Sequence, residues 1–232
     1  MLKTNNEYEI TYYKKDNFVD FHKIINEIIP QKSKNAKNTL KYKNYLYIIS
    51  GTVHQKKRLT IKLDDGNLFI SKLNKERISD ITDEIQHYCE YIETDADNKW
   101  YRVDEFDFNN WFSDTIDNYL YFSNKTKFNY GNFDFTIRED NTFFIDIVNM
   151  KIAKQVQYIE FESCSESNIN NKLEFFKQKM QKELGFSPIN LDYSKLSLCK
   201  SIKECKIPNN IDDFRNLFFS IFDLVYFELL DL

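Results

Sequence analysis

Four carboxylates in the second half of the chain lie on three consecutive predicted strands: Asp134, Asp146, Glu160 and Glu162. Lys151 and Lys154 are close to them in the sequence. Metal-dependent nucleases place carboxylates and a lysine on neighbouring strands, so that Mg²⁺ and an attacking water meet a phosphate. Apolar residues flank Asp146, which favours its partial burial. These residues could therefore form a nuclease site.

The same segment lacks the acid-x-Lys element that such nucleases use, because Glu160-Phe161-Glu162 is followed by Ser163. Glu160 and Glu162 could instead point to the solvent-facing side of an antiparallel sheet. The nuclease is therefore an alternative hypothesis rather than the leading one.

Basic residues are concentrated between residues 31 and 62, which contain nine Lys or Arg and no Asp or Glu. Tyrosines at 42, 45 and 47 are interleaved with them. Lysine and arginine neutralise phosphates, and aromatic faces stack on unpaired bases. We therefore expect a patch that binds a nucleic acid or an acidic protein surface. Its candidate residues are Lys41, Lys43, Lys56, Lys57, Arg58 and Lys62.

Acidic residues dominate residues 76–117, which contain thirteen Asp or Glu against three Lys or Arg. Glu93, Asp95 and Asp97 match the alternating ligands of a calcium loop. However, the first position is Glu and the twelfth, Asp104, is not the bidentate glutamate that such loops use. A polar connector between two helices explains this tract better than a calcium loop, and an acidic docking surface for a basic partner is a further alternative. We therefore predict no metal site there.

Motifs for nucleotide and nucleophile chemistry are missing from the sequence. It contains no P-loop, G-x-G-x-x-G or G-x-S-x-G motif and only 4 glycines. Four dispersed cysteines lack the paired spacing of a zinc site, and Cys164 lies between carboxylates that would raise its pKa. We therefore expect no cofactor.

Residue patterns predict the elements that must position these side chains. Alternation predicts strands at Tyr8–Tyr13, Tyr45–Val53, Leu59–Leu63, Leu68–Leu73, Asn132–Ile137, Thr142–Val148 and Gln157–Phe161. Helical spacing predicts helices at Phe18–Ile29, Lys75–Ile92, Asn110–Phe122, Asn168–Leu184, Leu196–Glu204 and Ile211–Leu230. Turns are expected at Asp64–Asn67 and at Glu139-Asp140-Asn141, and a loop at Gln31–Lys43.

Strands joined by tight turns and helices in blocks indicate the α+β class. We expect two antiparallel three-stranded meanders with flanking helices and a C-terminal apolar helix. The 232 residues would form a single domain, 1–232, or two lobes at 1–95 and 105–232.

The leading hypothesis is a non-catalytic accessory subunit of a larger bacterial or phage assembly, of the kind found in phage-defence loci. It would bind a protein partner, or a nucleic acid through residues 31–62, and a partner would cover the apolar helix 211–230. The sequence shows no signal peptide and no apolar stretch long enough for a membrane span, so we expect a cytoplasmic protein without membrane contact.

Overall fold

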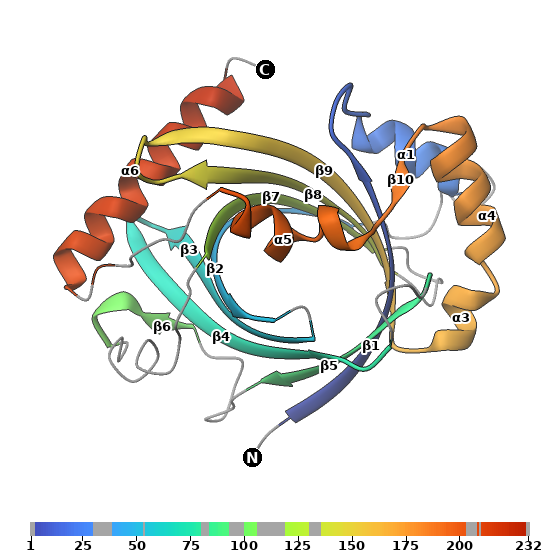
Figure 1. The fold of residues 1–232 in the computed structure, drawn as a ribbon, viewed down its shortest axis with the longest axis horizontal. Coiled ribbons are helices and arrows are strands. Elements are labelled where there is room, and N and C mark those ends of the chain that lie inside the picture. The colour runs from blue at the N-terminus through green and yellow to red at the C-terminus, as the bar shows by residue number, and fades with distance from the viewer. Residues whose placement is uncertain are drawn as a thin grey trace.

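The computed structural model describes residues 3–29, 39–52, 54–79, 84–92, 100–105, 119–129, 136–202, 208 and 210–230. Its main feature is a sheet whose eight long strands close into a barrel (Figure 1). These strands are β1 (Lys3–Lys14), β2 (Thr39–Gly51), β3 (Gln55–Asp64), β4 (Asn67–Arg77), β5 (Gln86–Ile92), β7 (Tyr119–Asn129), β8 (Thr136–Asp146) and β9 (Lys151–Ser163). Two short strands, β6 (Tyr101–Arg102) and β10 (Ser187–Pro188), pair with β4 and β1.

Closure of the barrel depends on pairing between strands that are far apart in the chain. The strand order is β1-β5-β4-β3-β2-β7-β8-β9, and β1 pairs with β9 to close the ring. All of these pairings are antiparallel, including β2 with β7, where Leu46 lies opposite Phe122. A closed sheet has no exposed edge strands along the barrel wall.

The predicted α+β fold with two separate meanders is therefore wrong. Hairpin signals reveal only neighbours in sequence, and they correctly placed Asp65 and Gly66 in the β3–β4 turn, where both have positive φ. Of the helix predicted over Lys75–Ile92, residues 75–77 end β4 and residues 86–92 form β5, while residues 80–83 lie outside the described residues. Of the helix predicted over Asn110–Phe122, residues 119–122 belong to β7 and the rest lie outside the described residues.

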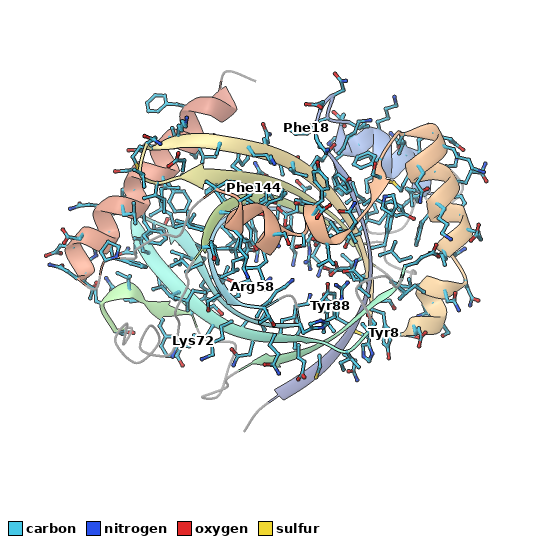
Figure 2. The ribbon with its side chains drawn as sticks, viewed as in Figure 1. Tyr8, Phe18, Arg58, Lys72, Tyr88 and Phe144 are labelled. Atoms are coloured by element: carbon cyan, nitrogen blue, oxygen red, sulfur yellow. The ribbon has the colours of Figure 1, made fainter. Side chains whose placement is uncertain are left out.

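Side chains alternate between the interior and the outer face along every strand, as the pleat requires. The turn predicted at Glu139-Asp140-Asn141 lies in the middle of β8, where this alternation buries Asp140 inside the barrel. Figure 2 shows Arg58 and Tyr88 inside the barrel outline, and Tyr8 and Lys72 outside it. The interior of the barrel is therefore where polar side chains from many strands can meet.

Helices cover two sides of the barrel wall (Figure 1). The remaining elements are α1 (Phe21–Ile28), η2 (Val103–Glu105), α3 (Glu166–Asn170), α4 (Leu173–Lys177), the π-helix η3 (Gln178–Glu183), η4 (Leu191–Tyr193), α5 (Lys195–Lys200) and α6 (Ile211–Leu230). Helices α1, α3 and α4 pack their apolar residues on the outer faces of β1 and β9. The stack of Phe161 on Phe176, with ring centroids 4.0 Å apart, illustrates this contact.

The C-terminal helix α6 has the bounds that its sequence predicts. Phe214, Phe218 and Phe222 are buried against the outer faces of β2, β3, β7 and β8. The barrel itself thus covers one side of this helix, while Tyr226 and Phe227 are exposed. None of the described helices is both long and apolar enough to span a membrane.

The short helix α5 lies across one end of the barrel (Figure 1). Leu196, Leu198 and Cys199 pack against the inward-facing aromatic residues Tyr121 and Tyr158, among others. The hydroxyl of Tyr158 also donates a hydrogen bond to the carbonyl of Tyr193, 2.9 Å away. The helix therefore closes this end of the barrel with apolar side chains. The charged side chains of the interior lie beneath this apolar layer, toward the opposite end of the barrel.

Candidate functional site

Cationic side chains from five different elements converge inside the barrel. The chamber beneath α5 has a volume of about 110 Å³. The cations that line it are Lys56, Arg58, Lys75, Arg77, Lys125, Arg138 and Lys195, and the described carboxylates that line it are Glu9 and Glu160. Strands β3, β4, β7 and β8 supply six of the cations, and α5 supplies Lys195. Such an excess of positive charge in an enclosed space favours an anionic ligand.

Carboxylates occupy the part of the wall formed by β1 and β9. Glu7 and Glu9 come from β1, and Glu160 and Glu162 come from the adjacent β9. Glu9 lies directly opposite Glu162 in the strand register. Like charges at opposite positions of neighbouring strands destabilise a sheet. This arrangement therefore needs compensating positive charge.

Lys75 provides part of that compensation. Its ammonium lies 2.5 Å from Glu7, 3.6 Å from Glu9 and 3.6 Å from Glu90. Burial by itself would raise the pKa of Glu7, but Lys75 and Arg138 outweigh burial and lower that pKa to about 2. Glu7 is therefore ionised at neutral pH.

Arg138 bridges the two carboxylates of β9. It lies 3.3 Å from Glu160 and donates a hydrogen bond of 2.6 Å to Glu162. The pKa of Glu162 is nevertheless raised to about 8, because burial and the nearby Glu7, Glu160 and Glu9 outweigh Arg138. One Arg therefore does not neutralise this cluster, and an additional cation would.

A metal ion is the cation that this cluster fits. Ligand oxygens of Glu7, Glu9 and Glu162 all lie within 4.8 Å of one another. The Oε1 atom of Glu162 accepts no hydrogen bond, although Nη1 of Arg138 is 2.5 Å from it. An all-oxygen set of carboxylates suits a hard divalent ion such as Mg²⁺ or Mn²⁺.

A second buried network ties α5 to the barrel wall. Asp140 is fully buried and accepts hydrogen bonds from Ser123, Thr142 and Lys195. Lys195 also lies 2.9 Å from Glu160, and Lys125 lies 3.3 Å from Asp140. Burial opposes ionisation of Asp140, but Lys195 and Lys125 lower its pKa overall. The network is charged and internally paired, which indicates a structural role.

We expect Lys195→Met to destabilise the protein by about 3 kcal/mol, because it leaves buried Asp140 and Glu160 short of a partner. The melting temperature should fall by roughly 6–12 °C in a thermal denaturation experiment. Lys200→Met, an exposed change on the same helix, is the control and should melt like the wild type. Equal melting temperatures for the two variants would contradict this role of Lys195.

Three cations of the chamber lack such pairing. In the described part of the chain, no carboxylate lies within ion-pair distance of Lys56, Arg58 or Arg77. The Nε atoms of Arg58 and Arg77 are buried and have no hydrogen-bond partner there. Lys56 lies directly opposite Lys75. Buried donors without acceptors are costly, so these groups indicate a site for an anion.

The structure separates the carboxylates that the sequence grouped as a nuclease site. Glu160 and Glu162 face the barrel interior rather than solvent, and both are buried. Asp146 instead accepts hydrogen bonds from the backbone and side chain of Asn149 in the β8–β9 turn. Asp134 lies outside the described residues, as do Glu93, Asp95 and Asp97 of the calcium-loop hypothesis.

The predicted basic patch divides between the two faces of the barrel wall. Five of its six residues have the alternation of the inner face: Lys41, Lys43, Lys56, Arg58 and Lys62. Lys57 has the same alternation as Leu59, which packs in the outer core beneath α6. Lys56, Lys57 and Arg58 all lie within β3, so the strand pleat places Lys57 on the face opposite to Lys56 and Arg58.

Sequence reasoning missed Glu7, Glu9, Lys75, Arg77, Lys125, Arg138, Asp140 and Lys195 as functional candidates. One signal was available for the first two. Glu7-Tyr8-Glu9 on β1 repeats the pattern of Glu160-Phe161-Glu162 on β9, with an aromatic residue between two glutamates. In both triplets the strand pleat turns the glutamates inward and the aromatic residue outward.

No family model matches this sequence. No curated protein matches it either. Among solved structures, a conserved hypothetical protein from Pyrococcus furiosus has a TM-score of 0.45 at 14% identity, covering 80% of this chain and 97% of its own. The PH1819 protein from Pyrococcus horikoshii OT3 has a TM-score of 0.43 at 14% identity, covering 84% and 99%.

The S. pombe Pct1 RNA triphosphatase has a TM-score of 0.39 at 11% identity, covering 78% of this chain and 79% of its own. These structural neighbours thus include an RNA triphosphatase together with the two Pyrococcus proteins. At these TM-scores and identities, the likeness carries neither a family assignment nor an activity to this chain.

Proposed function

We propose that this protein is a metal-dependent hydrolase that cleaves the terminal phosphoanhydride bond of a linear polyphosphate chain, such as a triphosphate. One observation carries the proposal. Inside one closed barrel, the described residues provide no acidic partner for Lys56, Arg58 or Arg77. In the same barrel, Glu7, Glu9 and Glu162 form a cluster in which the pKa of Glu162 is raised. A phosphate chain and a divalent cation together would satisfy both sets.

The number of cations supports a chain of phosphates rather than one phosphate group. Seven cations from β3, β4, β7, β8 and α5 surround the chamber, and three of them lack an acidic partner in the described structure. A single phosphate carries about two negative charges, whereas a triphosphate carries four or five. Arginine suits this role because its planar group binds phosphate oxygens in a bidentate manner.

The shape of the site supports a terminal phosphate chain over an internal phosphodiester. A barrel of eight strands leaves an interior that holds one small ligand at most. The α5 helix closes one end, so a linear anion would enter from the other. We therefore favour cleavage of a phosphoanhydride over the nuclease hypothesis. Of the carboxylates in that hypothesis, Glu162 belongs to the proposed metal site.

Hydrolysis breaks the bond between the terminal phosphorus and its bridging oxygen, and forms a new bond from that phosphorus to the oxygen of water. The products are inorganic phosphate, the shortened chain and a proton. A bound divalent ion would supply positive charge to the phosphate oxygens and lower the pKa of an attacking water. Glu7, Glu9 and Glu162 would hold that ion, while Arg58 and Arg77 would orient the phosphates and stabilise the charge that develops on them.

The experiment is a phosphate-release assay with inorganic tripolyphosphate and with ATP, in the presence of Mg²⁺, Mn²⁺ or EDTA. We expect phosphate release to require the metal. The first products should be inorganic phosphate and a chain that is shorter by one phosphate. The accessory-subunit hypothesis predicts no turnover under any of these conditions. A lack of metal-dependent release from both substrates would overturn the proposed function.

Lys56 makes the binding of polyphosphate dependent on pH. Its pKa is lowered to about 7, because burial and Lys75 disfavour the ammonium form more than Glu9 favours it. An anion stabilises the ammonium, so binding takes up a proton. We expect the affinity for tripolyphosphate to be roughly tenfold weaker at about pH 8.5 than at about pH 6.5. Calorimetry without metal would measure it.

The variant Lys56→Arg is the control for this prediction, because arginine stays charged over this pH range. The titration of tripolyphosphate affects both proteins equally, so comparing them isolates the titration of Lys56. Its affinity should vary less with pH than that of the wild type.

Without ligand, the folded protein holds fewer protons on Lys56 than the unfolded chain between about pH 7 and 10.5. This group therefore adds stability as the pH rises through that window. Identical pH profiles of the affinity or of the stability for the wild type and Lys56→Arg would contradict the titration assigned to Lys56.

A further inference from the structure

A second hollow lies at the end of the barrel opposite α5. Its volume is about 380 Å³, against about 110 Å³ for the chamber. Its lining contains Lys41, Lys43, Tyr45, Tyr47, Arg58, Thr60, Ser71, Trp100, Lys125, Lys127 and Arg138. Arg58, Lys125 and Arg138 also line the chamber, so the two spaces adjoin. A ligand anchored in the chamber can therefore extend into this wider mouth.

The mouth is strongly cationic. Six of its lining residues are Lys or Arg, and the described residues that line it include no carboxylate. Lys41 lies directly opposite Lys127, and Lys43 directly opposite Lys125, on the paired strands β2 and β7. Like charges at opposite positions cost stability. Of these lysines, Asp140 compensates Lys125 only, so the other lysines of the two pairs favour an anionic ligand. Lys41 and Lys43 are exposed and accessible to it.

Aromatic rings lie beside these lysines. The rings of Tyr45 and Trp100 are nearly parallel, with an interplanar angle of 9° and centroids 6.0 Å apart, and both residues are half-buried. Tyr47 continues the row, with its centroid 5.8 Å from that of Tyr45. Lysines that track a backbone together with aromatic rings that stack on bases are the features by which proteins bind single-stranded nucleic acid.

Resting on the proposed function, we infer that the mouth binds a single-stranded polynucleotide whose 5′ end carries the phosphate chain. The chain would enter the chamber past Arg58, and the first nucleotides would contact Tyr45, Trp100 and the lysine pairs. A long inorganic polyphosphate would satisfy the lysines but would leave the aromatic rings unused. An acidic protein surface would lack a phosphate end that reaches the chamber.

The test compares a 5′-triphosphorylated single-stranded RNA of about twelve nucleotides with ATP and tripolyphosphate. We expect the RNA to have a KM at least about tenfold lower than either small substrate, since each stacked base contributes substantially to affinity. Trp100→Ala should raise the KM for RNA at least about tenfold more than the KM for tripolyphosphate, with a smaller effect on kcat. Equal effects on both substrates would overturn the inference.

Two double variants test how much the lysine charges of the mouth contribute to RNA binding. Neutralising two phosphate contacts should reduce the slope of log K against log salt by about 1.4, at about 0.7 per contact for a single strand. We expect this change in Lys41→Gln/Lys43→Gln. The control Lys172→Gln/Lys182→Gln removes the same charge from exposed positions at the helices outside the barrel and should keep the wild-type slope.

Binding of the same RNA in EDTA, measured by fluorescence anisotropy, keeps the inference separate from the proposed function. Salt-dependent binding that weakens in Lys41→Gln/Lys43→Gln supports the mouth even if no substrate is hydrolysed. Hydrolysis of tripolyphosphate, without preference for RNA and without any effect of these variants, leaves the proposed function standing and overturns the polynucleotide site. Competition by long-chain polyphosphate as strong as that by RNA would also overturn it.

Discussion

Glu9→Gln should lower metal-dependent hydrolysis of tripolyphosphate on the order of a thousandfold. The substitution keeps the size and buried position of the side chain but removes one of three carboxylates whose ligand oxygens lie within 4.8 Å of one another. A metal ion supplies several kcal/mol of transition-state stabilisation, and each 1.36 kcal/mol is a factor of ten in rate. Phosphate release at saturating substrate would measure the change.

Metal binding provides a second readout for Glu9→Gln. The wild type should gain about 2.7 kcal/mol of stability when Mg²⁺ or Mn²⁺ is present at a hundred times its Kd, and melt roughly 5 °C higher or more. Glu9→Gln should lose most of this shift. A rate loss that leaves the shift intact would show that Glu9 acts without holding the metal.

Asp146→Asn is the matched control, because it also replaces a carboxylate of the barrel wall by its amide, on β8. Asp146 lies at the end of β8, where it accepts hydrogen bonds from the backbone and side chain of Asn149 in the β8–β9 turn. We therefore expect its activity to remain within about twofold of the wild type. A loss of activity as large as that of Glu9→Gln would move the site toward the carboxylates first suggested by the sequence.

Arg58→Met should reduce kcat/KM for tripolyphosphate on the order of a hundredfold, as removal of one donor to a developing oxyanion does. Arg58 lines both the chamber and the mouth, and its Nε has no hydrogen-bond partner in the described structure. Because its charge is not compensated by a carboxylate, the variant should melt at or above the wild-type temperature. Reduced activity together with undiminished stability is the outcome that a purely structural residue would not produce.

Lys57→Met is the internal control for Arg58→Met. The two residues are adjacent in sequence, but Lys57 has the alternation of the outer face of β3. Arg58 faces the interior, as Figure 2 shows. We expect Lys57→Met to retain wild-type kcat/KM. If both substitutions reduced activity equally, the division of the basic segment between two faces would have no functional meaning.

Several elements were predictable because their signals are local. The Asp65-Gly66 turn, the strands β2, β3 and β4 near their predicted positions, and α6 follow from residue type and spacing within short segments. The segment Lys75–Ile92 was not predictable in this way. Its isoleucines and tyrosine fit a helical period, yet pairing of β5 with both β1 and β4 overrides that preference.

Which side chains of one strand share a face can be read from residue positions alone, because the pleat has a period of two. Glu7 and Glu9 must point the same way, as must Glu160 and Glu162. That both pairs face the same barrel interior, with Glu9 and Glu160 lining the chamber, follows from the pairing of β1 with β9, which are far apart in the chain and close the barrel. Such long-range pairing depends on the burial and hydrogen bonding of the whole closed sheet, so the sequence of one segment does not predict it.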